Sequence, residues 1–136
     1  MLFGRSSNEE PLSRSEVRYT LEDALADANL KGKRVLVIIP DCTRSGPVGL
    51  FFRIFNDLLS GEAAKLDYLI ALGTHRPMSS GEIRRHLDVT AEEMERRYGD
   101  VRVFNHQWSD PATFENLGVI PASEIEELSG GLLSTD

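Results

Sequence analysis

Two short polar segments carry residue types that could perform acid/base chemistry and bind an anion. Residues 73–77 read Gly-Thr-His-Arg-Pro and follow the apolar run Leu66–Leu72, whereas residues 41–44 read Asp-Cys-Thr-Arg and follow the apolar run Val35–Pro40. An imidazole titrates near neutrality, so His75 could take up and return a proton at working pH. The guanidinium groups of Arg44 and Arg76 could each hold a carboxylate or a phosphate through two parallel hydrogen bonds.

Every one of these side chains also has a purely structural interpretation. A loop histidine can hydrogen-bond backbone, and an arginine can form a surface ion pair. Asp41 and Thr43 could orient hydroxyls or a ring of a ligand, yet the same residue types after a strand often satisfy the backbone of a turn. We interpret Cys42 as a small buried residue, because no histidine is adjacent to it and the chain contains no second cysteine.

A third polar segment follows the run Val101–Asn105 and contains His106 and Trp108. Both residues could line the same pocket, and a tryptophan is a suitable wall for a flat ligand. Trp108 could equally cap the core. The remaining histidine, His86, lies beside two arginines in a predicted helix, so we assign it to a solvated face.

The elements that must position these segments can be read from the apolar pattern. The continuous, β-branched run Val35–Ile39 is typical of a strand buried on both faces of a parallel sheet. Predicted strands cover Val35–Pro40, Lys65–Leu72 and Val101–Asn105. Helices are predicted at residues 21–29 after an N-cap at Thr20, from Pro47 to about residue 60, and, after Ser-x-x-Glu and Thr-x-x-Glu capping boxes, at residues 81–87 and 91–98.

This alternation predicts an α/β fold with an open, mostly parallel sheet flanked by helices. Loops at the carboxyl ends of such strands share one edge of the sheet, where ligands bind in open α/β folds. The segments that contain Asp41 and His75 should therefore lie close together. Residues 1–14 are polar and read as a flexible arm, and residues 15–136 read as one α/β domain.

Composition narrows the class of protein. The net charge of -7 argues against a nucleic-acid partner, which would need a basic face. No apolar run reaches the roughly 18–20 residues that span a bilayer, so we expect no membrane partner. A single cysteine fits a reducing compartment, and we expect a cytoplasmic protein. No spacing of histidines or cysteines indicates a metal site.

Taken in order, the three polar segments resemble the N-terminal domain of nickel-dependent lactate racemase and its 2-hydroxyacid racemase and epimerase relatives. The matching motifs are Asp-x-Thr-Arg at 41–44, Gly-Thr-His-Arg-Pro at 73–77 with Glu82 shortly after, and Asn-His at 105–106 followed by Asp-Pro at 110–111. The resemblance covers roughly residues 15–131, and residues 15–136 would then be part of such a domain.

The resemblance implies a reaction and roles for individual residues. Family members use a nickel-pincer nucleotide that accepts a hydride from C2 of a small 2-hydroxy acid and returns it to either face. Two histidines exchange the proton of the 2-hydroxyl, and the match places the first at His75. It places a substrate or cofactor contact at Arg44, with Asp41 and Thr43 beside it; Thr74, Arg76 and His106 also match motif positions and are assigned to substrate or cofactor binding.

The resemblance also implies what this chain lacks. Family enzymes are much longer, and the second histidine, the lysine that tethers the cofactor, the nickel-ligating histidine and the C-terminal domain would lie beyond residue 136. We therefore expect this chain to be a partial, catalytically incompetent N-terminal portion whose partner is the remainder of its own chain, and to bind no nickel stably by itself. Ser45 replaces the proline that often follows the first motif. Two alternatives remain open: a non-catalytic module that binds a small anion or nucleotide, and a self-sufficient acid/base enzyme that uses His75 alone.

Overall fold

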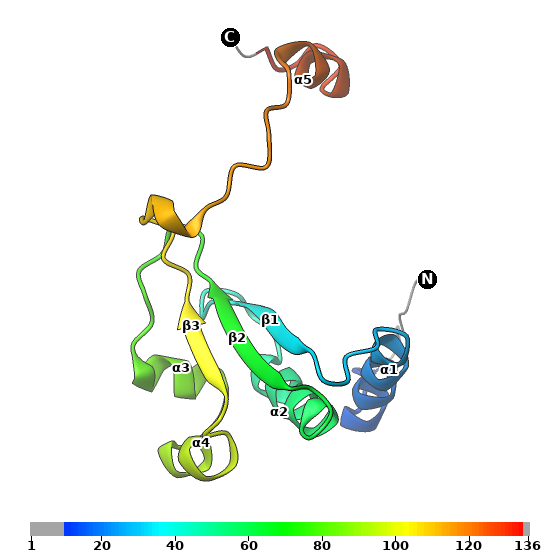
Figure 1. Cartoon of the computed structure of the whole chain (residues 1–136), viewed down its shortest axis with the longest axis vertical. Helices are drawn as coiled ribbons and strands as arrows, with labels where there is room; N and C mark the ends of the chain where they lie inside the picture. Colours follow the sequence, from blue (N-terminus) through cyan, green and yellow to red (C-terminus); the bar gives the residue numbers. More distant parts are fainter. Residues whose placement is uncertain (1–9, 135–136) are drawn as a thin grey trace.

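The computed structural model describes residues 10–134, which form an open α/β fold (Figure 1). In chain order the elements are α1 (Arg14–Ala26), β1 (Arg34–Pro40), α2 (Val48–Leu59), β2 (Lys65–Ala71), α3 (Ser80–His86), α4 (Ala91–Arg97), β3 (Arg102–Asn105), the short 3-10 helix η1 (Pro111–Thr113) and α5 (Ala122–Leu128). Among these residues, no helix has both the length and the apolar character that a membrane crossing requires.

The three strands form one parallel sheet in the order β1-β2-β3. Ile38 pairs with Leu69, and Leu69 pairs with Phe104, so the three strands are in a common register. The predicted strands, their parallel direction and the open sheet are thus confirmed, with strand ends within one residue of those expected. Because all strands point the same way, the loops that follow β1, β2 and β3 meet at one edge of the sheet (Figure 1).

One face of the sheet packs on α2, α3 and α4 (Figure 1). Both crossovers move in the same direction along the sheet, and right-handed crossovers of that kind place their helices on the same face. Tyr68 and Ile70 of β2 are fully buried against Phe52 of α2. The buried hydroxyl of Tyr68 is satisfied by the side-chain amide of Asn56, 3.0 Å away. This core fixes β2, the strand that leads into the His75 loop.

The opposite face of the sheet is uncovered by the described residues. Leu36 and Ile38 of β1 are 54% and 66% exposed, and Phe104 of β3 is 40% exposed. The expectation that Val35–Ile39 is buried on both faces was therefore wrong. Along this run, exposed side chains alternate with buried or half-buried ones, and Ile39 is the buried one. The physical reason is that two crossovers in one direction supply helices to one face only.

Helix α1 begins earlier than expected. Its N-cap is Ser13, which forms a complete capping box with Glu16. Thr20, the expected N-cap, lies inside the helix and donates its hydroxyl hydrogen bond to the backbone oxygen of Glu16 at 2.8 Å. The expected arm at 1–14 falls mostly on residues outside the described range, and Arg14 already belongs to α1.

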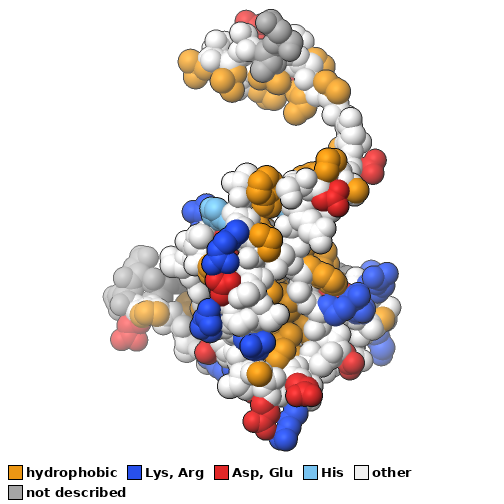
Figure 2. Space-filling view, turned by 90° about the vertical axis from the view of Figure 1, so that its left-hand side faces the viewer, with side chains coloured by type: hydrophobic (Ala, Val, Ile, Leu, Met, Phe, Trp, Pro, Cys, Tyr) orange, Lys and Arg blue, Asp and Glu red, His pale blue; other side chains and the backbone are white. Residues whose placement is uncertain are grey.

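After β3 the chain leaves the body of the molecule. An extended segment connects η1 to α5, and both the segment and the helix project away from the sheet (Figure 1). Leu117, Val119 and Leu128 are 95%, 87% and 77% exposed. Hydrophobic side chains gather along this projecting part (Figure 2). It therefore makes no contribution to the core around β2.

Candidate functional site

The loops after β1 and β2 meet at the carboxyl edge of the sheet, as predicted. Gly73 follows β2 with a φ of +59°, a left-handed conformation that glycine adopts without strain. This turn lets the backbone nitrogen of His75 donate to the oxygen of Leu72 at 3.0 Å. The His75 side chain is thereby directed toward the end of β1, where Asp41 lies.

Asp41 and His75 form a hydrogen-bonded pair. Their Oδ2 and Nδ1 atoms are 2.5 Å apart, and the Asp41 side chain is 5% exposed whereas that of His75 is 52% exposed. The other oxygen of Asp41, Oδ1, accepts from the backbone nitrogen of Thr43 at 3.1 Å and from its hydroxyl at 2.6 Å. A half-exposed imidazole thus rests on a buried carboxylate, which the adjacent turn holds.

The carboxylate of this pair is ionised at neutral pH. The hydrogen bonds from the Thr43 side chain and from His75 lower the pKa of Asp41 from its ordinary value of 3.8 to about 2, although burial opposes the change. An ionised carboxylate can only accept, so Nδ1 of His75 must donate its hydrogen. Nε2 is the ring nitrogen that remains for exchange of a proton with a ligand.

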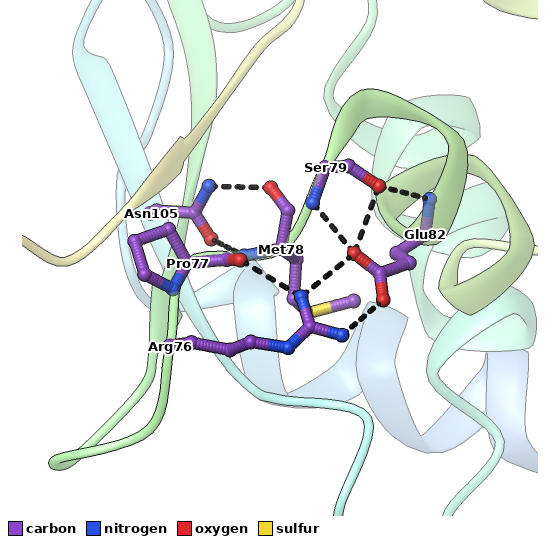
Figure 3. A network of polar contacts seen from close by, with 6 residues as sticks. All are labelled: Arg76, Pro77, Met78, Ser79, Glu82 and Asn105. Carbon is purple, nitrogen blue, oxygen red and sulfur yellow. Dashed lines mark hydrogen bonds and ion pairs between the residues drawn. The ribbon is translucent and has the colours of Figure 1, made fainter.

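Residues at the end of β3 and just after it anchor the His75 loop. This role was not predicted from the sequence. The side-chain oxygen of Asn105 accepts from the backbone nitrogen of Met78 at 3.0 Å, and its amide nitrogen donates to the Met78 oxygen at 2.8 Å (Figure 3). The indole nitrogen of Trp108 donates to the backbone oxygen of His75 at 3.0 Å. Trp108 is 39% exposed, so it positions the loop and does not cap the core.

Arg76 binds the start of α3. Its guanidinium holds both carboxylate oxygens of Glu82, at 2.6 and 3.1 Å, and Glu82 also completes the capping box with Ser79 (Figure 3). Hydrogen bonds from Arg76 and then from Ser79 hold the pKa of Glu82 far below its usual range. Arg76 therefore contributes to the support of the loop and keeps no free fork for a ligand in this arrangement.

The other residues proposed from sequence lie around the same edge with different surroundings. Arg44 and Thr74 are exposed, and the side chain of Arg44 makes no hydrogen bond or ion pair to the rest of residues 10–134. His106 is half-buried, and its ring meets that of Phe114 edge-on with 5.4 Å between centroids. Of this group, Arg44 is the side chain that is available to bind an anion.

Two residues differ from their expected surroundings. Cys42 is exposed, so the expectation of a small buried residue was wrong; it lies in the turn that Asp41 and Thr43 close, with its side chain outside. His86 is half-buried, not on a solvated face, and its Nε2 lies 2.8 Å from the backbone oxygen of Pro40. Since Pro40 directly precedes Asp41, His86 fixes the end of β1.

The site residues named above are separate from a cavity in the structure and, within residues 10–134, belong to no metal-ligating group. Within residues 10–134, no three histidine, cysteine or acidic side chains are grouped so that they could hold a metal ion. A cavity of about 850 Å³ is lined by Asn56, Ser60, Lys65 and Tyr98, among others, and none of the site residues named above lines it. Lys65 begins β2, so this cavity lies at the opposite end of the strand from His75.

Comparison with known proteins identifies a family and a structurally similar protein. A family model described as the lactate racemase N-terminal domain matches residues 5–126. A crystal structure of a protein from Thermotoga maritima superposes with a TM-score of 0.73 at 27% sequence identity, over 91% of this chain. This chain spans 28% of that protein's chain. No curated protein matches in a sequence comparison.

Proposed function

The chain belongs to the lactate racemase N-terminal domain family, and from this premise we propose that it supplies one acid/base group of a 2-hydroxyacid racemase or epimerase. The observation that carries the proposal is the pair of Asp41 and His75 at the carboxyl edge of the sheet, with a half-exposed imidazole on a buried carboxylate. A proton-transfer group must be both reachable by substrate and held in one orientation.

In this proposal His75 acts on the 2-hydroxyl of the substrate. Nε2 accepts the hydroxyl proton as the C–O bond gains double-bond character, and it returns the proton when the reaction reverses. Asp41 stabilises the imidazolium that forms, because the carboxylate stays ionised. Arg44 binds the substrate carboxylate or another anionic group through its exposed guanidinium. Thr74 and His106 are proposed to contact the substrate from the same edge.

The cofactor that the family implies is a nickel-pincer nucleotide, which supplies hydride acceptance and return at C2 when bound. The residues present fit part of such a group: the exposed Arg44 suits an anionic group of a nucleotide. Residues 10–134 contain no cluster of metal-ligating side chains that would hold nickel without the cofactor. We therefore propose that metal ligands and the opposing acid/base come from the remainder of a longer chain, and that this chain alone retains no nickel. A small 2-hydroxy acid is the proposed substrate, and the cytoplasm is the proposed location of the protein.

Racemisation of 2-deuterated lactate by the full-length, cofactor-loaded protein tests the reaction class. If His75 handles only the hydroxyl proton, the hydrogen at C2 moves with its electron pair, and the opposite enantiomer keeps its deuterium. Chiral separation followed by mass spectrometry measures both quantities. Loss of deuterium to the solvent would show that a base removes the C2 proton and would contradict the proposed role. Lactate binding without turnover would instead support a non-catalytic anion-binding module.

A further inference from the structure

We propose that Asp41 is a positioning residue that determines which ring nitrogen of His75 carries the proton, and that Thr43 determines how Asp41 is oriented. This assignment rests on the proposed acid/base role of His75. It differs from the sequence-based hypothesis that Asp41 and Thr43 contact a ligand. The reason is that the observed contacts of both carboxylate oxygens lie within the protein.

The two oxygens of Asp41 have separate partners. Oδ1 accepts two hydrogen bonds from Thr43, one from the backbone nitrogen at 3.1 Å and one from the hydroxyl at 2.6 Å. Oδ2 lies 2.5 Å from Nδ1 of His75. Because the Asp41 side chain is 5% exposed, little of it is open to a ligand. The backbone donor on Oδ1 has a fixed direction, so this oxygen must always be an acceptor.

This arrangement selects one tautomer of neutral His75. An acceptor at Oδ2 requires a hydrogen on Nδ1, which leaves a lone pair on Nε2. An imidazole in water favours the other tautomer, with the hydrogen on Nε2. Asp41 therefore increases the fraction of His75 that can accept a proton at the exposed nitrogen. The hydrogen bonds of Trp108 and Asn105 are made to the backbone of the loop.

The same geometry predicts an inverted tautomer in Asp41→Asn. The two donors of Thr43 will retain the amide oxygen of Asn at the Oδ1 position, so the amide nitrogen will face Nδ1 of His75. An amide nitrogen donates, so Nδ1 must then accept and the hydrogen moves to Nε2. The exposed nitrogen of the variant carries a hydrogen and has no lone pair for the substrate hydroxyl.

Long-range ¹H–¹⁵N correlation spectra of this 136-residue chain test the assignment at a pH where the rings are neutral. His→Gln variants assign the signals of the three histidines. In the wild type, Nε2 of His75 should resonate as an unprotonated nitrogen and Nδ1 as a protonated one; Asp41→Asn should reverse this pattern. Asp57→Asn, which makes the same change at a residue paired with Arg97, should leave it unaltered. A wild-type His75 with its hydrogen on Nε2 would overturn the proposal, even if Asp41→Asn does not fold.

Kinetics of the full-length, cofactor-loaded protein separate this proposal from the function on which it rests. With the tautomer reversed, turnover of Asp41→Asn should fall by about 10²–10⁴-fold, because the proton-transfer function of His75 is lost. A reversed tautomer with unchanged turnover would support the positioning role and contradict the acid/base role of His75. An unreversed tautomer would contradict the positioning role whatever the turnover.

Discussion

At the residue scale, the candidate site depends on a contact between side chains that are 34 positions apart in sequence. Asp41 is buried at the end of β1, and His75 is half-exposed after β2. The buried carboxylate stays ionised because Thr43 and His75 donate to it. The hydrogen bond between them joins the two residues into one unit.

The depressed pKa of Asp41 predicts how folding stability changes with pH. The unfolded carboxyl titrates near 3.8 and the folded one at about 2, so the unfolded state binds more protons between these values. The contribution of Asp41 is therefore complete above the unfolded pKa and is lost as pH falls through about 2. Urea denaturation from about pH 5 downward should show the free energy of unfolding of the wild type approaching that of Asp41→Asn.

A difference in the free energy of unfolding between wild type and Asp41→Asn that stays constant over the same pH range would contradict this prediction. Such a result would mean that the carboxyl titrates equally in the folded and unfolded states. Asp57→Asn serves as the control for the general effect of removing one negative charge.

The sequence predicted that Asp41, Arg44 and His75 lie on loops at one end of the sheet, and the structure brings Asp41 and His75 into contact there. The roles of these residues stay predictions. The sequence did not show whether Thr43 and Arg76 bind a ligand or a neighbouring residue. In the structure Thr43 donates to Asp41 in its own turn, and Arg76 binds Glu82. In both cases a nearby partner competes with a ligand for the side chain, and sequence alone does not show which one is in reach.

At the scale of elements, local signals predicted helix starts well where a capping box was considered. The boxes of Ser79 with Glu82 and Thr90 with Glu93 were confirmed. The predicted N-cap of α1 at Thr20 was wrong. The N-cap is Ser13, which has Glu16 three residues later and so forms a capping box. The link from β3 to the His75 loop could not be predicted, because it depends on the register of β3 beside β2.

Removal of the Asn105 side chain tests this link between elements. Asn105→Ala leaves the backbone nitrogen and oxygen of buried Met78 without their partners, which typically costs about 1–3 kcal/mol of unfolding free energy. Gln107→Ala, at an exposed position nearby, should change the unfolding free energy by less than about 0.5 kcal/mol. Urea denaturation of the two variants gives the comparison. Equal midpoints would mean that Asn105 does not hold the loop in solution.

At the scale of the whole molecule, the sheet has one packed face and one uncovered face within the described residues. The α/β class and the parallel sheet were predictable from alternating strand and helix signals. The uncovered face was not, because a continuous apolar run such as Val35–Ile39 looks the same whether or not a second layer is present in the chain. The projecting segment with α5 was also not foreseen (Figure 1).

Neighbouring isoleucines of β1 provide a matched test of this one-sided packing. Ile39→Ala removes a buried side chain and should cost about 2–5 kcal/mol of unfolding free energy. Ile38→Ala changes the same residue type on the same strand at a position that is 66% exposed, so its cost should be below about 1 kcal/mol. Differences in strand propensity cancel between the two. Equal losses in urea denaturation would indicate that the second face is covered in solution.

We propose that His75 is the acid/base group of this site, and steady-state kinetics of His75→Ala in the full-length, cofactor-loaded protein can test this role. We expect turnover to fall by about 10²–10⁴-fold in both directions, since that is the usual contribution of a proton-transfer group. Circular dichroism melts should show that the variant still folds, with a lowered melting temperature because buried Asp41 loses the hydrogen bond from His75. Near wild-type turnover of His75→Ala in both directions would contradict the claim.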